Sequence, residues 1–299
     1  MFARIRRAHS PSEPPMSANT LALIFDFDDT LTDDSTTKLL EKHGIDTKDF
    51  WRNKADTLVR DQGWDPTFAY LHLLLGCMEN KTLPPLTNED LRAFGKTLKP
   101  YPGLEALLKD LRKVAHAELF DIEFYIISGG LQDIIEGFKL RSEFAAVWGC
   151  QLAPSPTDPK GPVRHIKRAI TFTEKTRYVF EINKGIKPED AAKNPYLVNQ
   201  DIPYENRRIP FSHMIYIGDG LSDIPCMSVI TKHSNPGRAF GVFEPDSKSA
   251  KTMWKEMLAP QPPRVTSAHF PRYGKTHELG ALLRAMVTTR CSDLKLAKA

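Results

Sequence analysis

The fold of this chain is decided by the stretch Leu21-Ala22-Leu23-Ile24-Phe25-Asp26-Phe27-Asp28-Asp29-Thr30. Six of the seven residues from Leu21 to Phe27 are apolar, and an unbroken apolar run of this length is typical of a strand buried on both faces. Two acids, Asp26 and Asp28, follow where this strand should end. Because ligand sites in open α/β sheets lie beyond the carboxyl ends of the strands, the stretch predicts a site at that edge.

Asp26 and Asp28 are two residues apart, so both side chains project to the same side of an extended chain. One carboxylate could attack an electrophile while the other transfers protons, as in covalent catalysis by aspartate. Together they could also hold Mg²⁺, which prefers carboxylate, water and phosphate oxygens. The structural alternative is a turn that is rich in Asp because Asp suits turns.

A second apolar run, from Phe124 to Ile127, ends in Ser128, Gly129 and Gly130. We expect Ser128 at the same edge of the sheet, where its hydroxyl and the following backbone N–H groups could bind phosphate oxygens. The two glycines would let the backbone approach such a ligand closely. A plain strand-to-helix turn, with serine as the cap, explains this segment equally well in isolation.

A third run, from His213 to Ile217, leads into Gly218-Asp219-Gly220-Leu221-Ser222-Asp223. Asp219 at the strand end and Asp223 in the loop or first helical turn could reach one metal ion from two sides. As a purely structural residue, Asp223 would be an acid favoured by the dipole at a helix N-terminus. That alternative leaves the repeated pattern of strand followed by acid unexplained.

Two lysines could bring positive charge to these acids. Thr171-Phe172-Thr173-Glu174 predicts a capping box that opens a helix ending near Gly185. Helices of a doubly wound fold run antiparallel to the strands, so their N-termini lie at the carboxyl edge of the sheet. We therefore prefer Lys175, in the first turn, as the phosphate-binding lysine. Lys184, in the last turn, is the alternative and is expected at the opposite edge of the sheet, away from the acids.

Together these segments predict one site, made of Asp26, Asp28, Ser128, Lys175, Asp219 and Asp223. At this point the chain resembles the haloacid dehalogenase-like superfamily, most of whose members are Mg²⁺-dependent phosphatases. The four motifs of that superfamily correspond here to Asp26-Phe27-Asp28-Asp29-Thr30, Ser128, Lys175 and Gly218-Asp219-Gly220-Leu221-Ser222-Asp223. The resemblance spans roughly residues 20 to 245 and implies an α/β fold with a doubly wound, mostly parallel, Rossmann-like sheet.

The resemblance also implies a role for each residue. Asp26 would be the nucleophile that becomes an aspartyl-phosphate, and Asp28 would protonate the leaving group and then activate water. The phosphoryl group would be bound by Ser128, Gly129 and Lys175. The expected reaction is therefore the hydrolysis of a small phosphomonoester, and the expected partner is a small phosphorylated metabolite.

Mg²⁺ is the cofactor that the resemblance implies. Its ligands would be Asp26, Asp219 and the backbone carbonyl of Asp28, with Asp223 in or near that shell. Two alternative functions stay open: a phosphomutase or phosphotransferase that uses the same intermediate, and a phosphate-binding scaffold without turnover. The intact Asp28 argues against the scaffold, and also against halide chemistry, because the dehalogenases of the superfamily lack this second acid.

The order of the motifs is similar to that of phosphoserine phosphatase-type members, which carry a helical cap between the first two motifs. We expect the helical cap at 33–100, the core at 19–32 and 101–290, a disordered tail at 1–18 and a frayed tail at 291–299. Phosphoserine phosphatases normally place a Glu nine residues after the nucleophile, where this chain has Ser35. This difference argues against phosphoserine itself as the substrate. The segment 186–211 has no assigned role.

Composition limits the other functions. The chain has 299 residues, of which 41% are hydrophobic and 26% charged, with a net charge of +4. Because the basic residues are spread along the chain, we expect no nucleic-acid partner. No apolar stretch approaches the length of about 20 residues that spans a bilayer, so we expect no membrane partner either. The sequence leaves the oligomeric state open.

The four cysteines show neither CxxC nor metal-binding spacing, so we expect reduced thiols and a cytoplasmic protein. The first 17 residues contain three arginines and no acid before Glu13. Such a composition would also suit an organellar transit peptide. We prefer a disordered tail, or a native chain that starts at Met16.

Overall fold

The computed structural model describes residues 19–296, so the tail predicted at 1–18 lies outside the described residues. Its centre is a seven-stranded sheet in the order β4-β3-β2-β1-β5-β6-β7. The strands are β1 (Thr20–Phe25), β2 (Asp121–Leu131), β3 (Ala146–Pro154), β4 (Val163–Arg168), β5 (Met214–Gly218), β6 (Arg238–Val242) and β7 (Ser267–His269). Neighbouring strands pair in parallel, except for the antiparallel β3 and β4. The predicted mostly parallel α/β sheet is confirmed.

Strand β1 occupies the middle of this sheet, where it pairs with β2 and β5. All six of its residues are buried, which is why the run carries no polar alternation. Tyr216, in the middle of β5, is also completely buried. The parallel pairing brings the carboxyl ends of β1, β2 and β5 to one edge, and the residues that follow these strands meet there.

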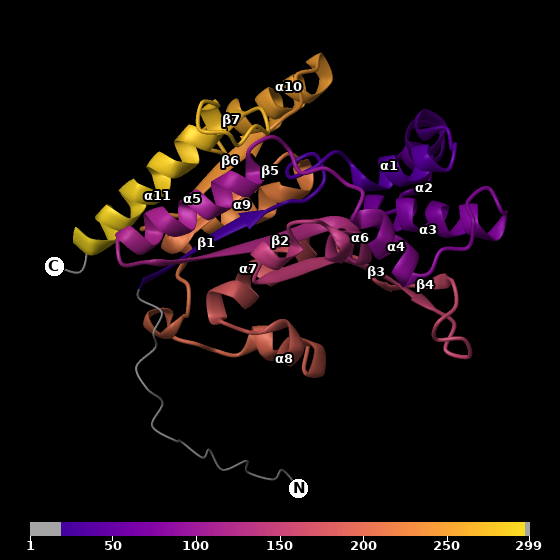
Figure 1. The fold of residues 1–299 in the computed structure, drawn as a ribbon, viewed down its shortest axis with the longest axis horizontal. Helices are drawn as coiled ribbons and strands as arrows, with labels where there is room; N and C mark the ends of the chain where they lie inside the picture. Colours follow the sequence, from indigo (N-terminus) through magenta and orange to yellow (C-terminus); the bar gives the residue numbers. More distant parts are fainter. Residues whose placement is uncertain (1–18, 297–299) are drawn as a thin grey trace, which may run out of the picture.

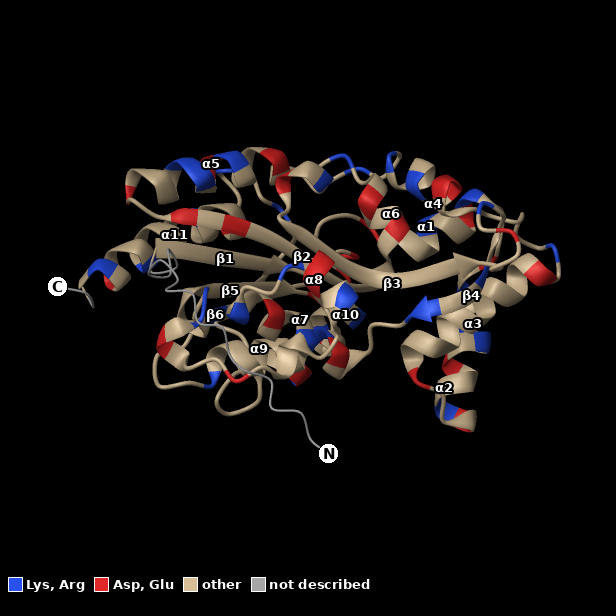
Figure 2. Ribbon diagram, turned by 90° about the horizontal axis from the view of Figure 1, so that it is seen from below, with Lys and Arg blue, Asp and Glu red and all other residues tan. Residues whose placement is uncertain are grey.

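Helices cover both faces of the sheet (Figure 2). On one face lies α5 (Leu104–Ala117), which buries leucines at three- and four-residue spacing, with α11 (Glu278–Leu296) packed beside it. On the other face lie α7 (Phe172–Lys184) and α9 (Ile224–Thr231). The N-terminus of α7 therefore faces the edge of the sheet that carries the acids.

Helix α11 corrects one prediction. Residues 291–299 were expected to form a frayed tail, but α11 continues to Leu296. Its last turns are held by burial of Cys291 and Leu294, and by a bond of 2.7 Å from Arg290 Nε to the carbonyl oxygen of Ser212. The helix is thus part of the core nearly to its end, and residues 297–299 lie outside the described range.

Between β1 and α5, every element is helical, as the sequence predicted for the cap. These elements are α1 (Ser35–Lys42), the π-helical turn η2 (Asp49–Ala55), α2 (Asp56–Gln62), α3 (Pro66–Glu79) and α4 (Asn88–Gly95). They gather beyond the carboxyl ends of β1 and β2, next to the β3–β4 hairpin (Figure 1). The division of the chain into cap and core at 33 and 100 stays a prediction.

The segment 186–211 contains α8 (Pro188–Lys193) and two short 3₁₀ turns, η4 (Leu197–Asn199) and η5 (Tyr204–Asn206). It lies away from the cap helices, beside α7 (Figure 1). The remaining helices are α6 (Gln132–Gly137), η3 (Arg141–Glu143), η6 (Phe211–His213), η7 (Leu221–Asp223), α10 (Ser247–Met253) and η8 (Trp254–Leu258).

All four cysteines are unpaired, in agreement with the predicted thiols. Within residues 19–296, no helix combines the length and the apolarity that a bilayer span requires.

Candidate active site

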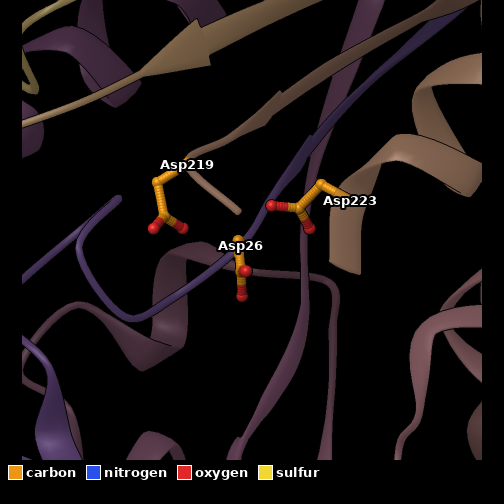
Figure 3. Close-up of side chains that lie close together, drawn as sticks. All are labelled: Asp26, Asp219 and Asp223. Atoms are coloured by element: carbon orange, nitrogen blue, oxygen red, sulfur yellow. The ribbon is translucent and has the colours of Figure 1, made fainter. Parts of the chain in front are cut away.

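Three acids from separate segments meet at the carboxyl edge of the sheet (Figure 3). Asp26 follows β1, Asp219 follows β5, and Asp223 is the N-cap residue of α9. Each offers a carboxylate oxygen, and these oxygens all lie within 4.8 Å of one another. Asp223 is completely buried and Asp26 is 6% exposed. The repeated pattern of strand followed by acid therefore converges on one point.

Lys175 lies within this acid cluster. Its ammonium Nζ is 2.7 Å from Asp26 Oδ2 and 2.8 Å from Asp223 Oδ1, and the side chain is 1% exposed. Lys184, at the other end of α7, instead donates to the carbonyl oxygens of Val198 and Gln200. The predicted placement of the two lysines relative to the acids is thus confirmed.

The predicted capping box at the start of α7 is wrong. Thr171 is the N-cap residue, but its side chain makes no capping hydrogen bond. The carboxylate of Glu174 accepts from Arg177 Nη1 at 3.1 Å instead of turning back to Thr171. An ion pair within the helix has therefore replaced the local cap, while the helix still starts at the expected residue.

Asp223 is held by three donors. Besides Lys175, its carboxylate accepts from the hydroxyl of Tyr216 at 2.8 Å and from the backbone N–H of Gly220 at 3.0 Å. The Asp223 carboxylate lies close to the backbone of residue 218. This position requires glycine, because a Cβ there would lie 2.3 Å from Asp223 Oδ2. Tyr216 was missed by the sequence reasoning, although a tyrosine in an otherwise aliphatic strand is a signal that could have marked it.

Asp28 stands apart from the three clustered acids and faces β2. Its Oδ1 accepts from the backbone N–H of Ser35 at 2.7 Å, and its Oδ2 lies 3.5 Å from the hydroxyl of Ser128. The backbone N–H of Gly130 donates to the same hydroxyl at 2.9 Å. Strand β2 continues to Leu131 rather than ending at Ser128, but its pairing with β3 is interrupted between 127 and 131. Ser128 and the glycines thus form an irregular stretch beside Asp28.

Burial and mutual repulsion shift the acids toward their protonated forms. Burial, with repulsion from Asp223, raises the pKa of Asp26 to about 6, although Lys175 counteracts this shift. The pKa of Asp28 is raised well above its usual value, chiefly by burial, and so is that of Asp219, where Asp26 adds repulsion. Burial alone would lower the pKa of Lys175, but Asp223 and Asp26 raise it above its usual value.

This donor set fits a divalent cation. One buried ammonium faces three carboxylates, so negative charge remains uncompensated in a site where an isolated charge is costly. Carboxylate oxygens are the ligands that Mg²⁺ prefers. Asp219 has the freest carboxylate of the three, since the bonds to Asp223 go to Lys175, Tyr216 and Gly220. Asp219 is accordingly the residue of the three that is most available to a metal ion, since both oxygens of Asp26 also accept hydrogen bonds.

A cavity of about 260 Å³ opens onto these groups. Its floor contains Asp26, Asp28, Asp219 and the stretch 128–130. The cap segment contributes the other side with Asp34, Thr36, Trp51, Pro66, Thr67 and Tyr70. Helix α3 touches the floor directly, because the hydroxyl of Tyr70 donates to the carbonyl oxygen of Gly129 at 2.6 Å. The cavity thus lies between the edge of the sheet and the helices α1 and α3.

Comparison with known proteins identifies the fold. No family model matches the chain. An uncharacterized protein of Borreliella burgdorferi is 28% identical over 261 residues, which are 80% of this chain and 88% of that protein. A solved phosphoserine phosphatase that carries an analogue of its phospho-aspartyl intermediate superposes with a TM-score of 0.53 and 14% identity, over 89% of this chain and 99% of that one. The chain has the haloacid dehalogenase-like fold, of the phosphoserine phosphatase type.

A hydrolase of the haloacid dehalogenase family from Salmonella enterica serovar Typhi is similar over 76% of this chain, with a TM-score of 0.50 and 16% identity. The chain spans 64% of the length of that hydrolase. Asp26 follows β1, the middle strand of the sheet, and Asp219 follows its neighbour β5, so both acids lie at one edge of the sheet. Of the site residues predicted from the sequence, Asp26, Asp28, Ser128 and Asp219 line one cavity, whereas Lys175 and Asp223 do not line it and are bonded to each other.

Proposed function

We propose that this protein is a Mg²⁺-dependent phosphatase that hydrolyses a small phosphomonoester through an aspartyl-phosphate on Asp26. The observation that carries the proposal is that the two acids of the first motif have different bonding partners at the cavity. Asp26 is bonded to a buried ammonium, whereas Asp28, two residues later, is bonded only by neutral groups. Two aspartates in such different surroundings suit the different tasks of nucleophile and proton donor.

Asp26 is suited to be the nucleophile. Lys175 and the backbone N–H of Phe27, each at 2.7 Å, stabilise its ionised form, so that with a pKa of about 6 the carboxylate is available at neutral pH. One of its oxygens attacks phosphorus and the bond from phosphorus to the ester oxygen breaks. When bound, Mg²⁺ would neutralise charge on the acids and on the phosphoryl oxygens.

Asp28 is suited to be the acid and then the base. Burial raises the pKa of Asp28, which favours the protonated carboxyl group that the first step needs. In that step the proton goes to the leaving alkoxide. The carboxylate that remains takes a proton from water, whose oxygen attacks phosphorus, so that the bond to Asp26 breaks and phosphate leaves. Ser128 and the N–H groups that follow it would bind phosphoryl oxygens during both steps.

The sharpest test uses Asp28→Asn with p-nitrophenyl phosphate and Mg²⁺. Because p-nitrophenolate leaves without a proton donor, Asp26 should still be phosphorylated, whereas hydrolysis of the intermediate should stop. We expect a burst of one p-nitrophenol per protein and a mass increase of one phosphoryl group. Asp26→Asn should show neither, and EDTA should abolish turnover by the unsubstituted protein.

Asp33→Asn is the matched control, because Asp33 is exposed and, among residues 19–296, forms a salt bridge with Lys38 alone. It should keep full activity. Wild-type turnover by Asp26→Asn would contradict the proposal. If the protein is a phosphatase, the amount of phosphate released should equal the amount of p-nitrophenol released, even when alcohols are added. A phosphotransferase would instead release less phosphate than p-nitrophenol, because the phosphoryl group would pass to the alcohol.

A further inference from the structure

The part of the cavity that lies away from the catalytic acids is lined mainly by rings. These rings belong to Trp51, Pro66, Tyr70 and Phe172, and the aliphatic side chain of Ile170 lies beside them. Among the described residues that line the cavity, there is no Lys, Arg or His. A lining of apolar and aromatic side chains with few polar groups is typical of a site for a small organic molecule. The organic part of a substrate would therefore meet rings rather than positive charge.

The polar ends of two of these rings are already bonded within the protein. Trp51 Nε1 donates to the hydroxyl of Thr37 at 2.9 Å, and the hydroxyl of Tyr70 donates to the carbonyl oxygen of Gly129 at 2.6 Å. The ring centroids of Trp51 and Tyr70 are 5.9 Å apart, and the planes are tilted by 47°. Because the bonds hold the rings by their polar ends, it is their carbon atoms that these side chains offer to a ligand.

Asp34 is an acid on the same side of the cavity, and it too has partners within the protein. Its carboxylate accepts from the backbone N–H of Thr37 at 2.5 Å as the N-cap of α1. Burial raises the pKa of Asp34, whereas the bond with Thr37 and the charge of Lys38 counteract the rise. Phosphoserine phosphatases normally place a glutamate one residue later, at the position of Ser35, which is completely buried here. The acid at the start of α1 thus serves the helix, and the next position carries no charge.

Two exposed phenylalanines continue the apolar lining to the surface. Phe172, which lines the cavity at the start of α7, is 40% exposed. Phe68 follows the lining residue Thr67 on α3 and is 43% exposed. The two helices meet here, because the hydroxyl of Thr67 donates to the carbonyl oxygen of Ile170 at 3.3 Å. Exposed apolar side chains that gather at one place are a mark of a ligand site.

We propose that the substrate is the phosphate ester of an aromatic alcohol, whose ring packs against Trp51, Tyr70 and Phe172. This inference rests on the proposed phosphatase function and names its substrate class. The volume of about 260 Å³ is smaller than the roughly 300–1,000 Å³ of sites for drug-sized ligands, so the cavity takes a compact ring next to the phosphate. An aromatic ring suits this lining better than an aliphatic one, because pairs of aromatic rings attract each other beyond the area that they bury.

The test compares benzyl phosphate with cyclohexylmethyl phosphate. Both are esters of primary alcohols with the same number of carbon atoms, so both need a proton from Asp28, but only benzyl phosphate carries a flat aromatic ring. We expect kcat/KM to be about tenfold higher for benzyl phosphate, which converts to about 1.4 kcal/mol and lies in the upper part of the range for aromatic pairs. Phosphoethanolamine, which carries an ammonium group in place of the ring, should be a poorer substrate than benzyl phosphate.

Two variants and one control place the ring in the cavity. Trp51→Leu and Phe172→Leu should each lower the ratio of the two kcat/KM values several-fold. Because Phe172 is partly exposed, its replacement leaves the packing of the helices between β1 and α5 undisturbed. Trp64→Leu is the matched control and should preserve the ratio, since Trp64 packs beside His72, with ring centroids 4.8 Å apart, and does not line the cavity. An unchanged ratio in both Trp51→Leu and Phe172→Leu would refute the placement of the ring.

Equal kcat/KM values for benzyl phosphate and its cyclohexyl analogue, in a protein that hydrolyses p-nitrophenyl phosphate, would overturn the substrate class and leave the phosphatase function intact. A higher value for phosphoethanolamine than for benzyl phosphate would do the same. Calorimetric titration of Asp26→Asn with the two ring esters provides a readout that does not depend on turnover. Benzyl phosphate should bind more tightly by a similar factor, and equal affinities would contradict the inference. Absence of hydrolysis of every ester would count against the phosphatase function alone, and the binding ratio would still decide the inference.

Discussion

Lys175 joins Asp26 to Asp223 through one buried ammonium, at 2.7 and 2.8 Å. The bond thereby connects the end of β1 to the start of α9, two segments that are nearly 200 residues apart. Lys175 also lowers the pKa of Asp26, the proposed nucleophile, in a site whose burial favours the protonated acid. A single side chain thus contributes both to the fold and to the proposed chemistry.

Lys175→Met should therefore affect activity and stability together. Loss of a buried donor at a reacting group lowers kcat by about a hundred- to a thousand-fold, and removal of one partner from a buried ion pair costs about 3–5 kcal/mol. Steady-state kinetics with p-nitrophenyl phosphate and urea unfolding measure the two effects. Lys184→Met is the control, because its ammonium bonds only backbone carbonyls. Larger losses of activity and stability in Lys184→Met than in Lys175→Met would refute the assignment of Lys175 as the phosphate-binding lysine.

The stability of the metal-free protein should fall as the pH rises. Asp26 has a pKa of about 6 in the folded state, against an ordinary value of 3.8, and the pKa values of Asp28 and Asp219 are raised as well. The folded state therefore retains protons that the unfolded chain has lost. This stabilising contribution is complete below the unfolded pKa and disappears as the pH passes through the folded pKa. Calorimetry in EDTA should show Tm decreasing between about pH 4 and pH 7, and Mg²⁺ should reverse the decrease.

Asp219→Asn should stabilise the metal-free protein and abolish its response to metal. The substitution removes one of three clustered charges, so repulsion with Asp26 and Asp223 disappears. In the unsubstituted protein, Mg²⁺ at a hundred times its Kd adds about 2.7 kcal/mol. Thermal melts with and without Mg²⁺ would show a higher Tm than wild type in EDTA and little further rise with metal. A lower Tm in EDTA would mean that the carboxylate of Asp219 is held by favourable contacts.

The main features of the site follow from the sequence because they depend on chain direction. Apolar runs fix the buried strands, parallel strands end at one edge, and an antiparallel helix must present its first turn there. This reasoning is enough to separate Lys175 from Lys184, although both lie on the same helix. It also brings Asp26 and Asp219 together, since each follows a strand of the same sheet.

The remaining details depend on tertiary contacts that have no local pattern. Tyr216 acts through a hydroxyl that reaches Asp223 across the turn after β5, and although a tyrosine stands out in this strand, the sequence does not show which residue its hydroxyl contacts. The cap at Thr171 gives way to an ion pair between Glu174 and a neighbouring arginine. The last turns of α11 persist because their buried face continues, whereas the composition near a terminus suggests fraying.

Gly130→Ala tests whether the position of Asp28 limits turnover. A Cβ at Gly130 would lie 2.3 Å from Asp28 Oδ2 and 3.2 Å from the hydroxyl of Ser128, so the acid has to move. At Gly129 the nearest atom to a new Cβ is the carbonyl oxygen of Ile170 at 3.9 Å, an ordinary contact. The two alanine variants are thus matched in sequence and differ in what they displace.

We expect Gly130→Ala to lower kcat at least ten times more than Gly129→Ala, because a displacement of about 1 Å at a catalytic group costs about a hundred-fold. The loss should be larger for an alkyl phosphate, which needs a proton from Asp28, than for p-nitrophenyl phosphate, which does not. Circular dichroism and Tm would verify that both variants fold. Equal losses for the two esters would show that the clash disturbs phosphate binding by Ser128 rather than proton transfer by Asp28.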